Sequence, residues 1–138
     1  EAHIVNLSSM LGFIGMPTQS SYCATKFAVR GLSEALWAEL HGSGIGVTSV
    51  HPGGVKTNIV RASRSADPSA KQQMAERIDR MAMAPEKAAL RILRAVERNA
   101  MRVVICPEAR ITEWVKRLSP VRVHRLVAYA YRRFGSLG

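Results

Sequence analysis

Two short runs rich in β-branched residues flank a segment of about twenty residues with helical periodicity. The first run covers residues 3–7 and the second covers residues 45–51. Between them, residues 20–40 carry apolar side chains at three- and four-residue steps, and Gly42 follows as a stop signal. A strand, a helix and a second strand of these lengths form a right-handed crossover in a parallel sheet. The sequence therefore predicts an α/β domain whose strands end at one edge of the sheet.

The predicted helix begins after Ser20 or Ser21, either of which is a suitable N-cap. Six apolar residues share one of its faces, which we predict to pack on the sheet: Ala24, Phe27, Ala28, Leu32, Ala35 and Leu36.

Three polar residues around the first strand and this helix suggest chemistry. Tyr22 and Lys26 are four residues apart and share a helix face. An ammonium beside a phenol stabilises the phenolate, so Tyr22 could act as an acid or base near neutral pH. Ser9 follows the first strand and could hold a carbonyl oxygen while Tyr22 transfers its proton. The alternative for Tyr22 and Lys26 is a packed ring beside a solvated amine. The alternative for Ser9 is that it and Ser8 merely cap a turn.

A second motif, residues 52–57, follows the second strand directly and reads Pro-Gly-Gly-Val-Lys-Thr. Proline and glycine let a backbone turn tightly and approach a flat ring closely. Because both strand ends open on the same edge, Ser9 and Thr57 could face one ligand from two sides. The alternative is an ordinary turn.

Together, the Ser, Tyr and Lys spacing and the Pro-Gly-x-Val-x-Thr segment resemble the C-terminal portion of the classical short-chain dehydrogenase/reductase family. The resemblance implies a Rossmann-like doubly wound parallel sheet in an NAD- or NADP-dependent oxidoreductase. Such an enzyme interconverts an alcohol and a ketone or aldehyde by hydride transfer. The resemblance assigns no chemistry to His51, which we expect to be structural.

The resemblance also assigns roles to individual residues. The expected catalytic residues are Ser9, Tyr22 and Lys26, of which Ser9 and Tyr22 would also contact the substrate. The expected coenzyme-binding residues are Tyr22, Lys26, Pro52, Gly53, Val55 and Thr57. No G-x-x-x-G-x-G loop occurs in the chain, and the family's Gly-rich loop and relay Asn would precede Glu1. The chain by itself is therefore expected to be inactive.

Residues 1–138 are thus expected to be the C-terminal part of one nucleotide-binding domain. By resemblance, residues 58–84 would form a substrate lid, and residues 108–138 a C-terminal helical extension. Methionines in the lid would suit a lipophilic substrate, although plain helix packing is the alternative. After the lid we expect a helix from Pro85, a last strand at 101–105, and helices at 111–118 and 121–134. A homo-oligomer, either a dimer or a tetramer, is also implied, with Trp37 or Val29 exposed for contact.

The formal net charge is +10, and the excess lies entirely beyond residue 60. No helix-turn-helix pattern, zinc-finger spacing or aromatic-interleaved basic strand accompanies it, so we expect no nucleic-acid partner. Cys23 and Cys106 lack metal-site spacing, which predicts no metal and fits a reducing cytoplasm. Two alternatives remain: a non-catalytic NAD(P)-binding regulatory protein, and a protein whose basic helix at 121–134 contacts a membrane surface.

Overall fold

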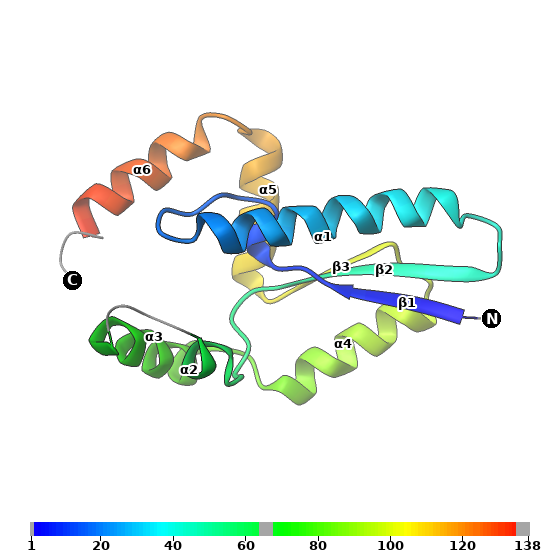
Figure 1. Ribbon diagram of the computed structural model, residues 1–138, viewed down its shortest axis with the longest axis horizontal. Coiled ribbons are helices and arrows are strands. Elements are labelled where there is room, and N and C mark those ends of the chain that lie inside the picture. Colours follow the sequence, from blue (N-terminus) through cyan, green and yellow to red (C-terminus); the bar gives the residue numbers. More distant parts are fainter. Residues whose placement is uncertain (1, 64–67, 135–138) are drawn as a thin grey trace.

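The computed structural model describes residues 2–63 and 68–134. Three parallel strands form one sheet in the order β1-β2-β3 (Figure 1). Their bounds are β1 (Ala2–Leu7), β2 (Ile45–Pro52) and β3 (Arg102–Ile105). Leu7 pairs with Val50, and Pro52 pairs with Ile105, so the ends of all three strands meet at one edge.

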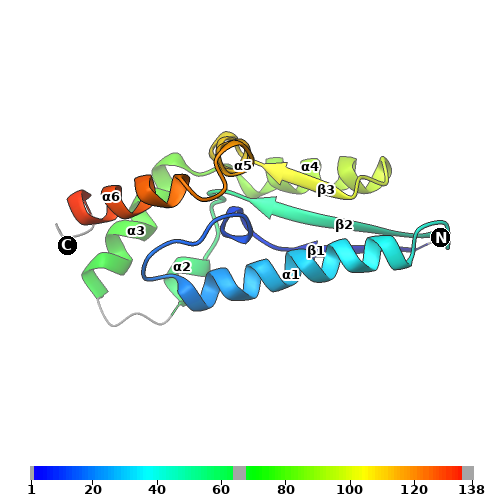
Figure 2. The same ribbon diagram turned by 90° about the horizontal axis from the view of Figure 1, so that it is seen from above.

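Helices cover both faces of the sheet. Helix α1 (Ser20–Glu39) contacts β1 and β2, and α4 (Pro85–Glu97) contacts β2 and β3. Figures 1 and 2 show these two helices on opposite sides of the strands. The predicted α/β architecture, a doubly wound parallel sheet of the Rossmann-like kind, is confirmed.

The remaining helices gather toward the carboxyl ends of the strands. They are the 3-10 helix η1 (Met10–Gly12), α2 (Ile59–Ala62), α3 (Pro68–Met81), α5 (Pro107–Leu118) and α6 (Val123–Phe134). Both views place α2, α3 and α6 beyond these strand ends. Helix α5 begins at Pro107 and not at residue 111 as predicted, because proline is favourable in the first turn of a helix.

The core lies between the sheet and α4. Val50, Ala88, Ile105 and Cys106 form a buried cluster there. On the other side, Phe13 of the loop after η1 is 2% exposed. Burying this apolar surface is the main favourable term that holds the layers together.

The predicted packing face of α1 is wrong. Phe27 is 41% and Leu32 is 55% exposed, whereas Ser33 is 1% exposed and lies against the sheet. Asn6 of β1 donates a hydrogen bond from Nδ2 to Ser33 Oγ at 3.2 Å, and Ser33 Oγ donates to Val29 O at 2.6 Å. The inward side of α1 therefore includes a polar contact from Ser33 beside the half-buried Val29, Leu36 and Trp37.

Two smaller predictions for α1 are also corrected. Trp37 and Val29, which we expected on the outer side, are both half-buried. The N-cap position is Gln19, which makes no side-chain capping bond, and not Ser20 or Ser21.

The segment expected to be a lid contains α2 and α3. An ion pair between Arg61 and Asp79 joins the two helices, and Lys71 Nζ donates to Ser63 O at 2.7 Å. Met83 is half-buried against the core cluster. Residues 64–67 and the side chains of Met74 and Met81 lie outside the described residues.

Helix α6 is amphipathic, but only part of its apolar side is covered. Val123 is buried and Val127 half-buried, while Leu126 is 67% exposed. Across the part of the chain that the structure describes, no helix has the length and apolar character needed to cross a membrane.

Gly12 provides a test of how closely η1 approaches α1. A Cβ atom at this buried position would overlap Ser8 Oγ and lie 3.0 Å from Lys26 O, whereas a Cβ at Gly15 would meet no atom within 4 Å. We expect Gly12→Ala to lower the free energy of unfolding by about 2 kcal/mol, because overpacking forces the two elements apart. Gly15→Ala is the control and should change it by less than about 1 kcal/mol. Urea denaturation of the full-length protein measures both, and equal effects would contradict the close packing.

Candidate active site

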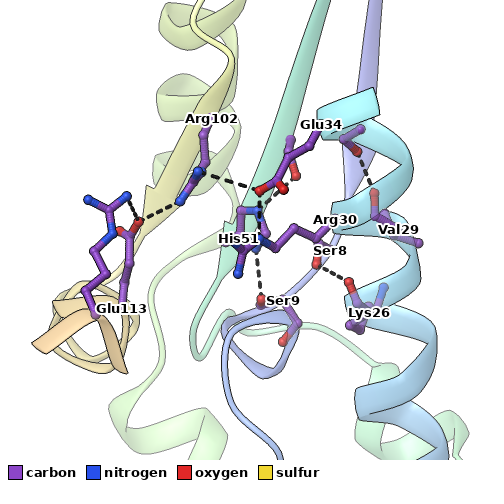
Figure 3. A network of polar contacts seen from close by, with 12 residues as sticks. Ser8, Ser9, Lys26, Val29, Arg30, Glu34, His51, Arg102 and Glu113 are labelled. Carbon is purple, nitrogen blue, oxygen red and sulfur yellow. Dashed lines mark hydrogen bonds and ion pairs between the residues drawn. The ribbon is translucent and has the colours of Figure 1, made fainter. Parts of the chain in front are cut away.

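The second turn of α1 is bonded to the carboxyl end of β1. Lys26 Nζ donates to Leu7 O at 3.0 Å, and Ser8 Oγ donates to Lys26 O at 2.8 Å (Figure 3 shows the second bond). The Ser8 N–H in turn donates to Val50 O of β2 at 2.8 Å. These bonds place the ammonium group of Lys26 beside the strand end from which Ser9 follows.

Tyr22 and Lys26 share a face of α1, as predicted from their spacing. The Lys26 Nζ atom lies 5.5 Å from the centre of the Tyr22 ring. Tyr22 is half-buried, and its hydroxyl has no hydrogen-bond partner within the described residues. The phenol is therefore available to a ligand.

Ser9 both caps a turn and retains a proton to donate. Its side chain accepts a hydrogen bond from the Leu11 N–H at 3.2 Å, and its carbonyl oxygen accepts one from the Gly12 N–H at 2.9 Å. These contacts make Ser9 the N-cap of η1. Because Oγ acts only as an acceptor there, its own O–H can still donate to a ligand oxygen.

The Pro52–Thr57 loop is tied to two other parts of the chain. The Gly53 N–H donates to Ile105 O of β3 at 3.1 Å. Val55 forms a parallel bridge with Met83, in which the Met83 N–H donates to Gly54 O at 2.9 Å. Val55 is half-buried in this bridge, whereas Thr57 is exposed. The loop is thus ordered at the carboxyl edge, with a hydroxyl facing solvent.

Two residues that support this loop escaped the sequence analysis. The Gly54 N–H donates to Glu108 Oε1 at 2.8 Å, and Cys106 Sγ donates to Gly54 O at 3.4 Å. Burial raises the pKa of the Cys106 thiol, which keeps it protonated as a donor. Cys106 also has a φ of 79°, a strained backbone conformation of the kind found near functional sites. Glu108 and Cys106 are more than fifty residues from Gly54 in the sequence, so no local pattern could have predicted these contacts.

His51 is the third residue whose contacts the sequence did not reveal. It is fully buried, and its Nδ1 lies 3.1 Å from Ser9 O (Figure 3). Its Nε2 lies 2.9 Å from Ser49 Oγ. Burial lowers its pKa to about 4, the bond to Ser9 opposes this shift, and the charges of Arg102 and Arg30 add to it. The imidazole is therefore neutral at physiological pH.

The structure brings the predicted residues to one edge of the sheet. Ser9 follows β1, Lys26 is bonded to the end of β1, and the Pro52–Thr57 loop follows β2. Within the described residues, no hydrogen bond joins Ser9 to Tyr22 or to Thr57. This edge is where open α/β sheets bind their ligands.

Comparison with known proteins agrees with this geometry. The family model described as short chain dehydrogenase matches residues 1–68. A protein designated oxidoreductase SadH in Mycobacterium tuberculosis is 42% identical over 138 residues, which cover 97% of this chain and 50% of SadH. A 3-alpha-(or 20-beta)-hydroxysteroid dehydrogenase of the same organism is 54% identical over 54 residues, which cover 39% of this chain and 21% of that protein.

A solved structure shows the same fold. The short chain dehydrogenase/reductase from Burkholderia phymatum, crystallised in complex with NAD, superposes with a TM-score of 0.72 at 26% identity. The match covers 86% of this chain and 48% of the Burkholderia chain. The chain belongs to the short-chain dehydrogenase/reductase family of oxidoreductases. It spans about half the length of SadH and of the Burkholderia protein.

The buried imidazole makes stability depend on pH. The folded-state pKa of His51 is about 4, below the value of about 6.5 expected in the unfolded chain, so only the unfolded state binds a proton between these values. The free energy of unfolding should therefore fall as pH decreases from about 6.5 to about 4, by at most about 3 kcal/mol, and the His51 contribution should level off below that. Urea denaturation of the full-length protein at several pH values measures this. His51→Asn removes the titrating group, so an identical pH dependence in wild type and variant would contradict the assignment.

Proposed function

We propose that the chain forms the catalytic edge of an NAD- or NADP-dependent oxidoreductase that interconverts an alcohol and a ketone or aldehyde. The observation that carries this proposal is the position of Lys26. Its ammonium group reaches both the Tyr22 ring and the main chain of Leu7, two residues before Ser9. One cation thus joins the proposed proton donor to the strand end that carries the proposed substrate-binding hydroxyl.

The chemistry assigned to the protein is proton transfer and orientation. In the reducing direction, the Ser9 hydroxyl donates a hydrogen bond to the substrate carbonyl oxygen, and Tyr22 gives that oxygen a proton. In the oxidising direction, Tyr22 accepts the proton of the alcohol. Lys26 places a positive charge 5.5 Å from the centre of the Tyr22 ring. When bound, the coenzyme supplies or accepts the hydride.

The donor groups at the carboxyl edge fit a nicotinamide coenzyme. Lys26 and Tyr22 would bind the ribose hydroxyls, and the main chain at Pro52, Gly53 and Val55 would approach the carboxamide. Thr57 is exposed and can add a hydroxyl contact. The presence of NAD in the Burkholderia protein supports the assignment of NAD or NADP.

The proposed substrate is a small alcohol or carbonyl compound covered by residues 58–84, and a lipophilic one is favoured. The support comes from the similarity to a hydroxysteroid dehydrogenase. Residues 108–138 would add the C-terminal helices to this single nucleotide-binding domain.

We also propose that the protein acts as a homo-oligomer, a dimer or a tetramer. The support is the uncharged outer face of α1, where Phe27 and Leu32 are exposed. This face differs from the one expected from sequence. A purely regulatory role for the scaffold is less well supported, because Ser9 and Tyr22 keep a free donor and a free phenol at the ligand-binding edge.

The proposed reaction is tested by Tyr22→Phe in the full-length protein. We expect turnover of a panel of alcohols and ketones to fall at least about a hundredfold, because the variant lacks the acidic proton. Binding of NAD or NADP, followed by fluorescence titration, should change little. Tyr129→Phe, at an exposed tyrosine of α6, is the control and should keep full activity. Undiminished turnover in Tyr22→Phe would refute the mechanism.

The role of Glu108 in holding the coenzyme loop is tested by Glu108→Ala. Loss of the acceptor for the Gly54 N–H should loosen the loop and raise the coenzyme dissociation constant about fivefold, which corresponds to one hydrogen bond. Glu86→Ala is a matched control, since Glu86 also follows a proline that begins a helix. An equal effect of both substitutions would show that helix stability, and not the loop contact, is responsible.

A further inference from the structure

The environment of His51 combines complete burial with a role in positioning Ser9. The imidazole is 0% exposed and stacks on the Phe13 ring, with 4.3 Å between centroids and 25° between planes. It occupies the strand position directly before Pro52, the first residue of the proposed coenzyme loop. The imidazole thus contacts the turn that carries Ser9 from the residue directly before the proposed coenzyme loop.

The hydrogen bonds define which nitrogen of His51 carries the proton. Ser9 O can only accept, so Nδ1, at 3.1 Å, must be the donor. In a neutral ring Nε2 is then an acceptor, and the Ser49 hydroxyl donates to it at 2.9 Å. One tautomer satisfies both contacts. Among the described residues, every buried polar side-chain atom has a hydrogen-bond partner.

The bond from Nδ1 ties Ser9 itself to β2, next to Ser8, whose N–H already donates to Val50 O of the same strand at 2.8 Å. Within the described residues, the other hydrogen bonds of Ser9 go only to Leu11 and Gly12, inside its own turn. The turn fixes the Ser9 hydroxyl relative to η1, and the imidazole fixes the Ser9 backbone relative to β2. Removing the imidazole contact would leave Ser9 O bonded only within its own turn, so Ser9 could reorient while Ser8 remains anchored to β2.

Charged groups from three elements surround the stacked pair; Arg102 and Arg30 lower the pKa of His51 further, whereas Glu113 opposes this shift. From α1, Arg30 lies 5.1 Å from the centre of the Phe13 ring and pairs with Glu34 at 2.8 Å. From β3, Arg102 lies 5.8 Å from the same ring and pairs with Glu113 of α5 at 2.8 Å. Arg102 also approaches Glu34 at 3.7 Å, and Arg117 of α5 pairs with Glu113 at 3.0 Å (Figure 3 shows most of this network). The nearest cations are paired, and they disfavour an additional positive charge on the imidazole.

We propose that the neutral imidazole of His51 is a positioning residue: its Nδ1–H holds the Ser9 carbonyl and thereby sets the place of the Ser9 hydroxyl in the reaction. This inference rests on the proposed function of Ser9. It assigns His51 no contact with substrate or coenzyme. Its effect should appear in the chemical step and not in coenzyme binding.

Two variants separate the roles of the two nitrogens. The side-chain amide of His51→Asn can reproduce the Nδ1–H donor toward Ser9, whereas the longer amide of His51→Gln reaches the place of Nε2 and leaves Ser9 O without its donor. In the full-length protein we expect kcat to stay within about threefold of wild type in His51→Asn and to fall at least about tenfold in His51→Gln. The KM for NAD or NADP should stay within about twofold in both.

Ser49→Ala removes only the partner of Nε2 and is the matched control, with an expected kcat within about threefold of wild type. Equal losses of kcat in the Asn and Gln variants, or a loss that appears equally in the coenzyme KM, would overturn the positioning role. Thermal unfolding of each variant establishes that a kcat difference arises in folded protein.

A second readout separates this inference from the proposed function. Amide hydrogen exchange at Gly12, whose N–H donates to Ser9 O, should be faster in His51→Gln than in His51→Asn. If wild type turns over none of the alcohols and ketones, the proposed function fails, and exchange alone decides whether His51 holds Ser9. Equal exchange rates in the two variants would overturn the inference even in an active enzyme.

Discussion

The contact between the second turn of α1 and the carboxyl end of β1 is the constraint on which the site depends. Lys26 Nζ donates to the carbonyl of Leu7, and Ser8 Oγ donates to the carbonyl of Lys26, so helix and strand are joined in both directions. This contact requires Gly12, whose missing side chain leaves room for η1 against α1. Tyr22 lies one turn before Lys26, and the centre of its ring is 5.5 Å from the ammonium group that is bonded to Leu7 O. The Lys26 ammonium group therefore contributes both to the packing of α1 on β1 and to the proposed chemistry.

The Pro52–Thr57 loop depends on a different set of contacts, drawn from the second half of the chain. Glu108 and Cys106 hold Gly54 from the start of α5, and Met83 pairs with Val55 from the segment before α4. Met83, two residues after the end of α3, is thus bonded directly to the proposed coenzyme loop. The proposed lid and the proposed coenzyme site are physically continuous.

A partly buried polar network lies around His51, the last residue of β2's buried stretch before the loop. His51 stacks on Phe13 and bonds to Ser9, while Arg30 and Arg102 approach the Phe13 ring. Isolated ion pairs at a surface contribute little to stability, but partly buried and shared pairs restrict the geometry of the elements that carry them. Here the ion pairs join α1, β3 and α5 beside the stacked Phe13 and His51 rings, and the His51 imidazole is neutral at physiological pH. Restricting the position of His51 also restricts the Ser9 carbonyl to which it is bonded.

The sequence by itself determined the parallel strands, the crossover helix, the shared face of Tyr22 and Lys26, and the position of Ser9 after a strand, because each depends on local periodicity or spacing. It did not determine which face of α1 packs on the sheet. Phe27 and Leu32 of the apolar stripe lie outward, and the inward side includes Ser33, which is bonded to Asn6 of β1. The contacts of His51 with Ser9 and of Glu108 with Gly54 also came only from the tertiary structure. Each joins residues more than forty positions apart, and only the folded sheet brings such residues together.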